Sequence, residues 1–300
     1  MGRTRLRGIE LAGIRVAVEV PPNSSWDWAD TPHHRFECSP LDPDLYIGVR
    51  RGVPDLPRTD FVVYACDGST FEVGRHGTDW VVVIHGPGHS ERIARFDASF
   101  REGEVWIRPD AAESLAHPLV HPLDEIIVLH RIAREGGLML RGSAVLREGR
   151  ALVFVGDTER SEDRAPISGW RQIGAPSLSG GRVVLRVQGR DVWLFGAPWQ
   201  SDAAFALPIR ARLDAVHSIR ESPAVCAERL YADAATSELL AHVFAPVHDP
   251  DGAARLHGVA ERVAERVPVV SLGLPEEQRV VPFTWGQRHA ALAFAPPFLT

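Results

Sequence analysis

Short apolar runs bounded by turn residues recur through the first third of the chain, and they limit the folds open to it. The runs cover residues 14–20, 45–49, 61–64, 71–73, 80–84 and 105–107. Gly, Pro or Asp residues bound each run, as is typical of strands joined by turns. We therefore expect a β-rich N-terminal domain over residues 1–120, in which the Trp-, His- and Pro-rich segment 23–44 is irregular.

The second part of the chain mixes helical and strand patterns. Residues 122–136 begin with Pro, carry acidic residues in the first turn and Arg in the last, and end in glycine, which predicts a helix. Further strands are expected over 138–146, 151–155, 182–186, 192–195 and 269–272, and further helices over 224–245 and 252–266. The pattern predicts an α/β fold, with a core around a mixed sheet over 121–284 and an apolar tail over 285–300.

The composition excludes several classes of protein. The formal net charge is −6 and the pI is near 6.1, so nucleic acid is not an expected partner. Cys38, Cys66 and Cys226 are scattered and fit neither a zinc ribbon nor a disulfide framework, which favours a reducing compartment. No signal peptide is evident, and no run reaches the roughly 18 apolar residues that a membrane helix needs. We expect a cytoplasmic protein without a membrane partner.

Lysine is absent from the chain, since all 33 residues counted as Lys or Arg are arginine. Ala, Arg, Gly and Pro are abundant and Asn occurs once, a bias that is typical of a GC-rich genome. Whatever its origin, this composition leaves no lysine to neutralise a phosphate, form a Schiff base or act as a catalytic amine.

The apolar run 151–155 leads into Gly156, where a nucleotide-binding protein would continue into a phosphate loop. Such a loop has two glycines separated by four residues, followed by Lys and then Ser or Thr. Here Ser161, Glu162 and Asp163 occupy the positions of the second Gly, the Lys and the hydroxyl residue. A carboxylate about 4 Å from a phosphate charge would cost about 4 kcal/mol in a partly buried site. The loop therefore predicts a nucleotide-binding scaffold that has lost its phosphate site.

Over residues 123–274 the order of landmarks resembles the HPr kinase-like family of bacterial P-loop kinases. That family includes HPr serine kinases and peptide-tailoring kinases found near lasso-peptide genes. The matching segments are 140–143 (Leu-Arg-Gly-Ser), the loop 156–163, 178–184 (Leu-Ser-Gly-Gly-Arg-Val-Val) and 196–199 (Gly-Ala-Pro-Trp). The family has Leu-His-Ala-Ser, a phosphate loop, Ser-Asp-Asp and Gly-Thr-Pro-Trp in this order. The resemblance implies a β-rich N-terminal region followed by a P-loop core around a mixed sheet.

The departures from the family pattern fall on residues that handle the nucleotide. In the family the loop and its Lys hold phosphates, its hydroxyl holds Mg²⁺, and the aspartate pair assists the metal and the acceptor. In this chain Arg141 replaces the His, Ser161 the second Gly, Glu162 the Lys, Asp163 the hydroxyl residue, and Gly180 and Gly181 the aspartate pair. Losses in three motifs that share one task predict no catalytic residue, no cofactor and no metal.

These departures favour a catalytically inactive kinase homologue, a pseudokinase, that binds a peptide or protein partner in natural-product peptide biosynthesis. Two alternatives stay open: an active peptide-modifying enzyme or serine kinase with a non-standard phosphate site, and a structural subunit that stabilises an active paralogue. The oligomeric state is open as well. By motif position we expect partner binding at Arg141, Arg182 and Trp199, in a groove between the core and the N-terminal region.

The planar guanidinium group of arginine is well suited to bind the carboxylate or phosphate groups of a partner. Arg160, Arg164 and Arg171 also fall near the former phosphate site by motif position. Glu159, Glu162 and Asp163 could instead pair with these arginines within the loop.

Three other groups of residues are weaker candidates for a metal site or a catalytic nucleophile. His33, His34 and Cys38 could ligate a metal with Asp42, but the surrounding Pro and Trp residues favour a solvated loop. His117 and His121 are four residues apart, yet Pro118 and Pro122 break the helix that would align them as a zinc pair. Ser143 follows a strand without the Gly-x-Ser-x-Gly elbow of a nucleophile.

Overall fold

The computed structural model describes residues 5–21, 28, 31–55, 60–66, 69–86, 89–108, 117–119, 121–156, 177–199 and 206–274. The chain divides into two compact units, the first made of Met1–Glu135 and Ala245–Arg255, and the second of Gly136–Phe244 and Leu256–Thr300. The domain boundaries expected at 1–120, 121–284 and 285–300 stay predictions, and the tail lies outside the described residues. No helix among the described residues is both long enough and apolar enough to cross a membrane.

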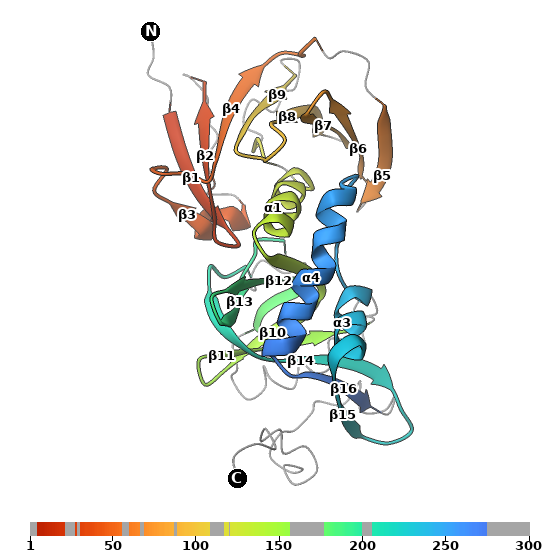
Figure 1. The fold of residues 1–300 in the computed structure, drawn as a ribbon. Helices are drawn as coiled ribbons and strands as arrows, with labels where there is room; N and C mark the ends of the chain where they lie inside the picture. Colours follow the sequence, from red (N-terminus) through yellow and green to blue (C-terminus); the bar gives the residue numbers. More distant parts are fainter. Residues whose placement is uncertain are drawn as a thin grey trace. The chain divides into compact units, whose positions relative to one another are not determined.

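Unit 1 is built on a nine-stranded sheet, drawn from red to yellow in Figure 1. Its strands are β1 (Arg5–Leu11), β2 (Ile14–Val20), β3 (Glu37–Cys38), β4 (Leu45–Arg51), β5 (Phe61–Cys66), β6 (Ser69–His76), β7 (Asp79–Gly86), β8 (His89–Phe96) and β9 (Glu102–Ile107). The spatial order is β3-β1-β2-β4-β9-β8-β7-β6-β5. The β2–β4 and β4–β9 pairs are parallel, and the other neighbours are antiparallel.

The local sequence explains most of this sheet. Ala12 and Gly13 both have positive φ, 54° and 76°, as a two-residue hairpin turn between β1 and β2 requires. Strands β1 and β8 were not expected, because charged residues such as Arg92 and Arg95 interrupt the apolar pattern of β8. The sheet accommodates Arg92 nonetheless, since its side chain is fully buried. Cross-strand pairing thus overrides local composition in these two strands.

Helix α1 (Leu123–Arg134) is the core helix of unit 1, and the predicted helix over 122–136 is confirmed. Almost all of its residues are buried, so its surroundings cover it on every side. His130 stacks on Phe100 with ring centroids 4.5 Å apart, and Arg131 donates a hydrogen bond from Nη1 to the carbonyl of Ser99 at 3.2 Å. These contacts hold α1 against the turn that joins β8 to β9.

Unit 2 contains a seven-stranded mixed sheet. Its strands are β10 (Gly137–Arg147), β11 (Arg150–Val155), β12 (Ser177–Gln188), β13 (Asp191–Phe195), β14 (Arg210–Glu221), β15 (Cys226–Leu230) and β16 (Val269–Leu274). The pairs β11–β14 and β14–β16 are parallel. The antiparallel pairs β10–β11, β10–β12, β12–β13 and β13–β14 join with β11–β14 into a closed ring of five strands. The prediction of an α/β fold with a β-rich region before a mixed sheet is confirmed.

One prediction for the segments that follow this ring is wrong. We expected one helix over 224–245, but residues 226–230 form strand β15, and helix α3 covers only Ala232–Ala241. Strand β15 pairs antiparallel with β16 at the edge of the sheet, and this pairing decides its conformation. Helix α4 (Pro250–Arg266) matches the expected helix closely. The short 3-10 helix η1 (Pro32–Phe36) and β3 lie in the segment that we expected to be irregular.

A buried histidine in β14 makes the stability of unit 2 depend on pH. His217 stacks on Phe154 with ring centroids 5.2 Å apart, and burial lowers its pKa to about 4 despite a hydrogen bond to the backbone of Val153. Between that value and the ordinary pKa near 6.5, the unfolded chain binds a proton that the folded chain does not. We expect the contribution of His217 to be complete above about pH 6.5 and to fall by about 1.4 kcal/mol per pH unit below it.

Urea unfolding of the wild-type protein and of His217→Gln, at about pH 7 and about pH 4.5, tests this expectation. The glutamine side chain does not titrate and retains an amide donor. The wild-type protein should lose roughly 2–3 kcal/mol more than the variant over this interval. Equal losses in the two proteins would show that His217 is not the titrating group.

Candidate functional site

The site begins at the carboxyl ends of the parallel strands β11, β14 and β16. Val155 is paired with Ser218, and Ser218 with Ser271, so the chain leaves β11 at Gly156 beside the end of β14. Gly156 has a φ of 149°, and a Cβ there would lie 3.1 Å from the carbonyl oxygen of Ile219. Only glycine suits this backbone, and α/β sheets bind ligands at this edge.

The rest of the altered loop cannot be compared with its predicted shape. The residues of interest there lie outside the described part of the chain: Glu159, Arg160, Ser161, Glu162, Asp163, Arg164 and Arg171. Their effect on nucleotide binding stays a prediction from sequence.

Two other family motifs converge next to Gly156. Gly142 in β10 is paired with Val155 on one side and with Gly181 on the other, while Ser143 is paired with Gly180. A Cβ on Gly142 would lie 2.5 Å from the carbonyl oxygen of Phe154, so β10 and β11 approach too closely for a larger residue. Gly156 and the segments around Gly142 and Gly181, which are far apart in the sequence, thus lie side by side.

Two of the three predicted partner-binding residues lie together. Arg141 in β10 is directly opposite Arg182 in β12, so both side chains leave the same face of the sheet. Their guanidinium carbons lie 5.5 Å and 5.6 Å from the ring centroid of Phe244. Arg141 is exposed, while Arg182 and Phe244 are partly exposed. We call these three residues the arginine platform.

Backbone hydrogen bonds hold the segment that carries Phe244 against β10. The amide of Arg141 donates to the carbonyl of His242 at 2.7 Å, and the amide of Phe244 donates to the carbonyl of Met139 at 2.8 Å. Residues 242–244 therefore add to β10 like a short antiparallel strand. The His242 Nε2 atom lies 3.3 Å from Glu238 Oε1 on α3, and that oxygen also accepts a hydrogen bond from Ser218. This network links the platform to the end of β14.

The third predicted residue, Trp199, lies in the turn after β13. Its side chain is only 7% exposed, so it belongs to the core of unit 2. Gly196 packs closely against the segment before β14, because a Cβ on Gly196 would lie 1.8 Å from the carbonyl oxygen of Leu207. A partner-binding role for Trp199 stays a prediction, as does the expected groove between the core and the N-terminal region.

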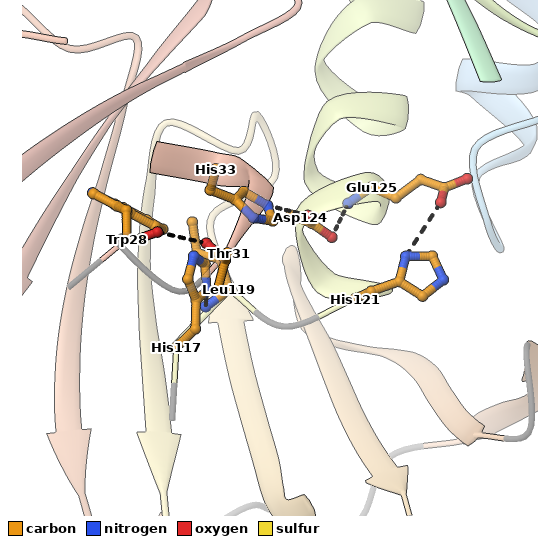
Figure 2. Close-up of polar contacts among 8 residues, drawn as sticks. All are labelled: Trp28, Thr31, His33, His117, Leu119, His121, Asp124 and Glu125. Carbon is orange, nitrogen blue, oxygen red and sulfur yellow. Dashed lines mark hydrogen bonds and ion pairs between the residues drawn. The ribbon is translucent and has the colours of Figure 1, made fainter. Parts of the chain in front are cut away.

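Unit 1 holds a separate polar cluster, which Figure 2 shows. His33 on η1 approaches Asp124 on α1, with Nε2 2.7 Å from Oδ2, and the second carboxylate oxygen of Asp124 accepts from the amide of Glu125. Trp28 and His117 lie against the His33 ring, with centroids 5.9 Å and 4.6 Å away. The expected solvated loop is therefore wrong for His33, because this cluster draws its side chain inward.

The histidines that we considered as metal ligands make other contacts. His117 accepts a hydrogen bond from the amide of Leu119 at 2.9 Å, and burial, with a smaller effect of the neighbouring His33, lowers the pKa of His117 to about 3. His121 instead lies 3.5 Å from a Glu125 carboxylate oxygen. Burial raises the pKa of the Cys38 thiol. Among the described residues, no group of three or more His, Cys, Asp or Glu side chains is placed to hold a metal ion.

Sequence reasoning did not find Phe244 or Glu238. Neither residue belongs to a family motif that we considered, and each reaches the site only because α3 returns the chain to β10 and β14. The sequence offered one signal for Phe244, its apolar side chain shortly after His242. We had assigned that segment to a helix. The contact between His33 and Asp124 was missed for the same reason, since 91 positions separate them in the sequence.

Comparisons with known proteins add little to this geometry. No model of a protein family matches the chain, and no curated protein matches it in sequence. Among solved structures, the chain is similar to the Hpr(Ser) kinase/phosphatase from Coxiella burnetii, with a TM-score of 0.27 and 6% sequence identity. That similarity covers 46% of this chain and 85% of the other. We infer nothing about activity from so weak a superposition.

Proposed function

We propose that this protein is a kinase-like scaffold that binds a peptide or protein partner and does not transfer phosphate. The observation that carries this proposal is the arginine platform, where two guanidinium groups face one partly exposed aromatic ring beside the position of the former phosphate loop. Arginine forks bind carboxylate and phosphate oxygens through several hydrogen bonds at once. A place in natural-product peptide biosynthesis stays a prediction.

The residues beside the platform support binding over catalysis. Gly180 and Gly181 stand where the resemblance implies a pair of aspartates, and glycine has no side chain to hold a metal or to take a proton from an acceptor hydroxyl. The nearest hydroxyl on β10, that of Ser143, belongs to a buried residue. Phosphoryl transfer depends on positioned metal ions and charges, which these positions do not supply.

Titration with ATP and Mg²⁺, followed by thermal unfolding, tests the proposal. A ligand present at 100 times its Kd would stabilise the protein by about 2.7 kcal/mol. We expect no Mg²⁺-dependent increase in Tm at millimolar ATP, because Glu162 and Asp163 replace the cation and the hydroxyl of the loop. Magnesium without nucleotide is the control for non-specific effects of the ion.

A clear increase that requires both ATP and Mg²⁺ would overturn the proposal and favour an active enzyme with a non-standard phosphate site. Stabilisation by a co-expressed kinase homologue, with no peptide bound by either protein, would favour the structural-subunit alternative.

A further inference from the structure

From the arginine platform we infer that the partner is an acidic peptide segment in extended conformation, whose carboxylates bind Arg141 and Arg182. This inference rests on the proposed function and names the chemistry of the partner. Arg141 and Arg182 supply the charge, and the ring of Phe244 supplies a surface on which the aliphatic part of a Glu side chain can lie.

The spacing of the platform is compatible with two carboxylates, one for each arginine. Each guanidinium carbon lies within 5.6 Å of the same ring centroid, so the two carbons are at most about 11 Å apart. In an extended peptide, side chains at alternate positions leave the same face, roughly 6.6 Å apart. Two acidic residues separated by one other residue can therefore reach one guanidinium each.

The guanidinium groups of the platform can each take part in several hydrogen bonds. Arg141 and Arg182 make other contacts as well, but each guanidinium has five N–H donors in a planar fork. The carboxylate of Glu238 is held by Ser218 and His242. The phenyl ring near both guanidinium carbons limits their freedom before a ligand arrives, which lowers the entropic cost of binding.

The test measures binding of a fluorescent peptide with Glu at alternate positions, separated by Thr, to the full chain. Arg141→Ala and Arg182→Ala should each weaken binding by roughly 10- to 100-fold, because each removes a charge-assisted hydrogen bond. Phe244→Leu keeps every charge and should weaken binding by roughly two- to fivefold. Thermal unfolding of each variant establishes that it is folded.

Arg150→Ala is the matched control. Arg150 lies on β11 and forms an exposed ion pair with Asp214 at 2.9 Å, so its removal changes the net charge equally, away from the platform. It should bind the peptide as the wild-type protein does. An equal loss of binding in Arg150→Ala would show that total charge, and not the platform, governs binding.

The remaining outcomes overturn the inference or identify another anion. Equal binding of a peptide with Gln in place of Glu, or no binding of the Glu peptide at millimolar concentration, would overturn it. Tighter binding of a phosphoserine peptide or of inorganic phosphate would overturn the choice of carboxylate. Mg²⁺-dependent ATP binding would instead contradict the proposed function, and it is measured without the peptide, so the two failures can be distinguished.

Discussion

Replacing Trp80 by alanine is expected to lower the free energy of unfolding of unit 1 by about 3–5 kcal/mol. The side chain is fully buried in β7 and lies 4.5 Å from the ring of His130 on α1 and 5.8 Å from that of Phe100, measured between centroids. The guanidinium carbon of Arg75 lies 3.9 Å from the same ring. Truncation would leave a cavity between the sheet and α1 that rigid neighbours cannot fill.

Urea unfolding followed by circular dichroism measures this loss. Trp80→Phe keeps a large aromatic ring and should lose clearly less than Trp80→Ala. Leu6→Ala is a second control, because the Leu6 side chain is 40% exposed and should change stability by less than about 1 kcal/mol. A loss in Trp80→Ala as small as that in Leu6→Ala would contradict the packing of α1 on β7.

Replacing Asp249 by alanine should cost about 3–5 kcal/mol, because it leaves the partly buried Arg134 without its counter-charge and the buried His130 without its polar partner. The Asp249 side chain is almost fully buried and lies 2.7 Å from Arg134 Nη2 and 3.3 Å from His130 Nδ1. Its other oxygen accepts from the amide of Gly252 at 3.0 Å and so caps the first turn of α4. One carboxylate thus joins α1 to the start of α4.

The same carboxylate predicts a dependence on pH. Burial alone would raise the pKa of Asp249, but hydrogen bonds from His130 and Gly252 and the charge of Arg134 outweigh burial and hold it well below its usual range. The stabilisation is therefore present above about pH 4 and is lost as the pH falls through the lower folded-state pKa. Acid unfolding should begin at higher pH in Asp249→Ala than in the wild-type protein, whereas Asp249→Asn should retain the helix cap. Identical acid transitions would show that Asp249 carries no such shift.

The two proposals place binding in unit 2 on side chains that the strand order brings together. Arg141 and Arg182 are neighbours because β10 pairs with β12, and Gly156 lies beside them because β10 also pairs with β11. Under the proposed function, this part of unit 2 holds an anion and lacks the groups for phosphoryl transfer. The proposal therefore assigns binding to a site where the resemblance implies catalysis.

Local pattern was enough to predict the elements whose signals are short-range. The helix at α1 follows from its acidic first turn and glycine end, and the hairpin between β10 and β11 follows from Glu148 and Gly149, whose φ angles are 50° and 76°. The proximity of Arg141 and Arg182 could also be expected, because motif order implied it. The helix and the hairpin depend on residues near one another in the chain, and the proximity of the two arginines was expected from the resemblance.

Tertiary structure decided the rest. Residues 226–230 became strand β15 because the edge of β16 was available to pair with them. Phe244 reached the two arginines only through hydrogen bonds between residues 242–244 and β10, and His33 reached Asp124 across 91 positions. Sequence periodicity reports which face of an element is apolar, whereas the partner of that face depends on how distant segments pack. The binding chemistry that we propose depends on contacts between such distant segments.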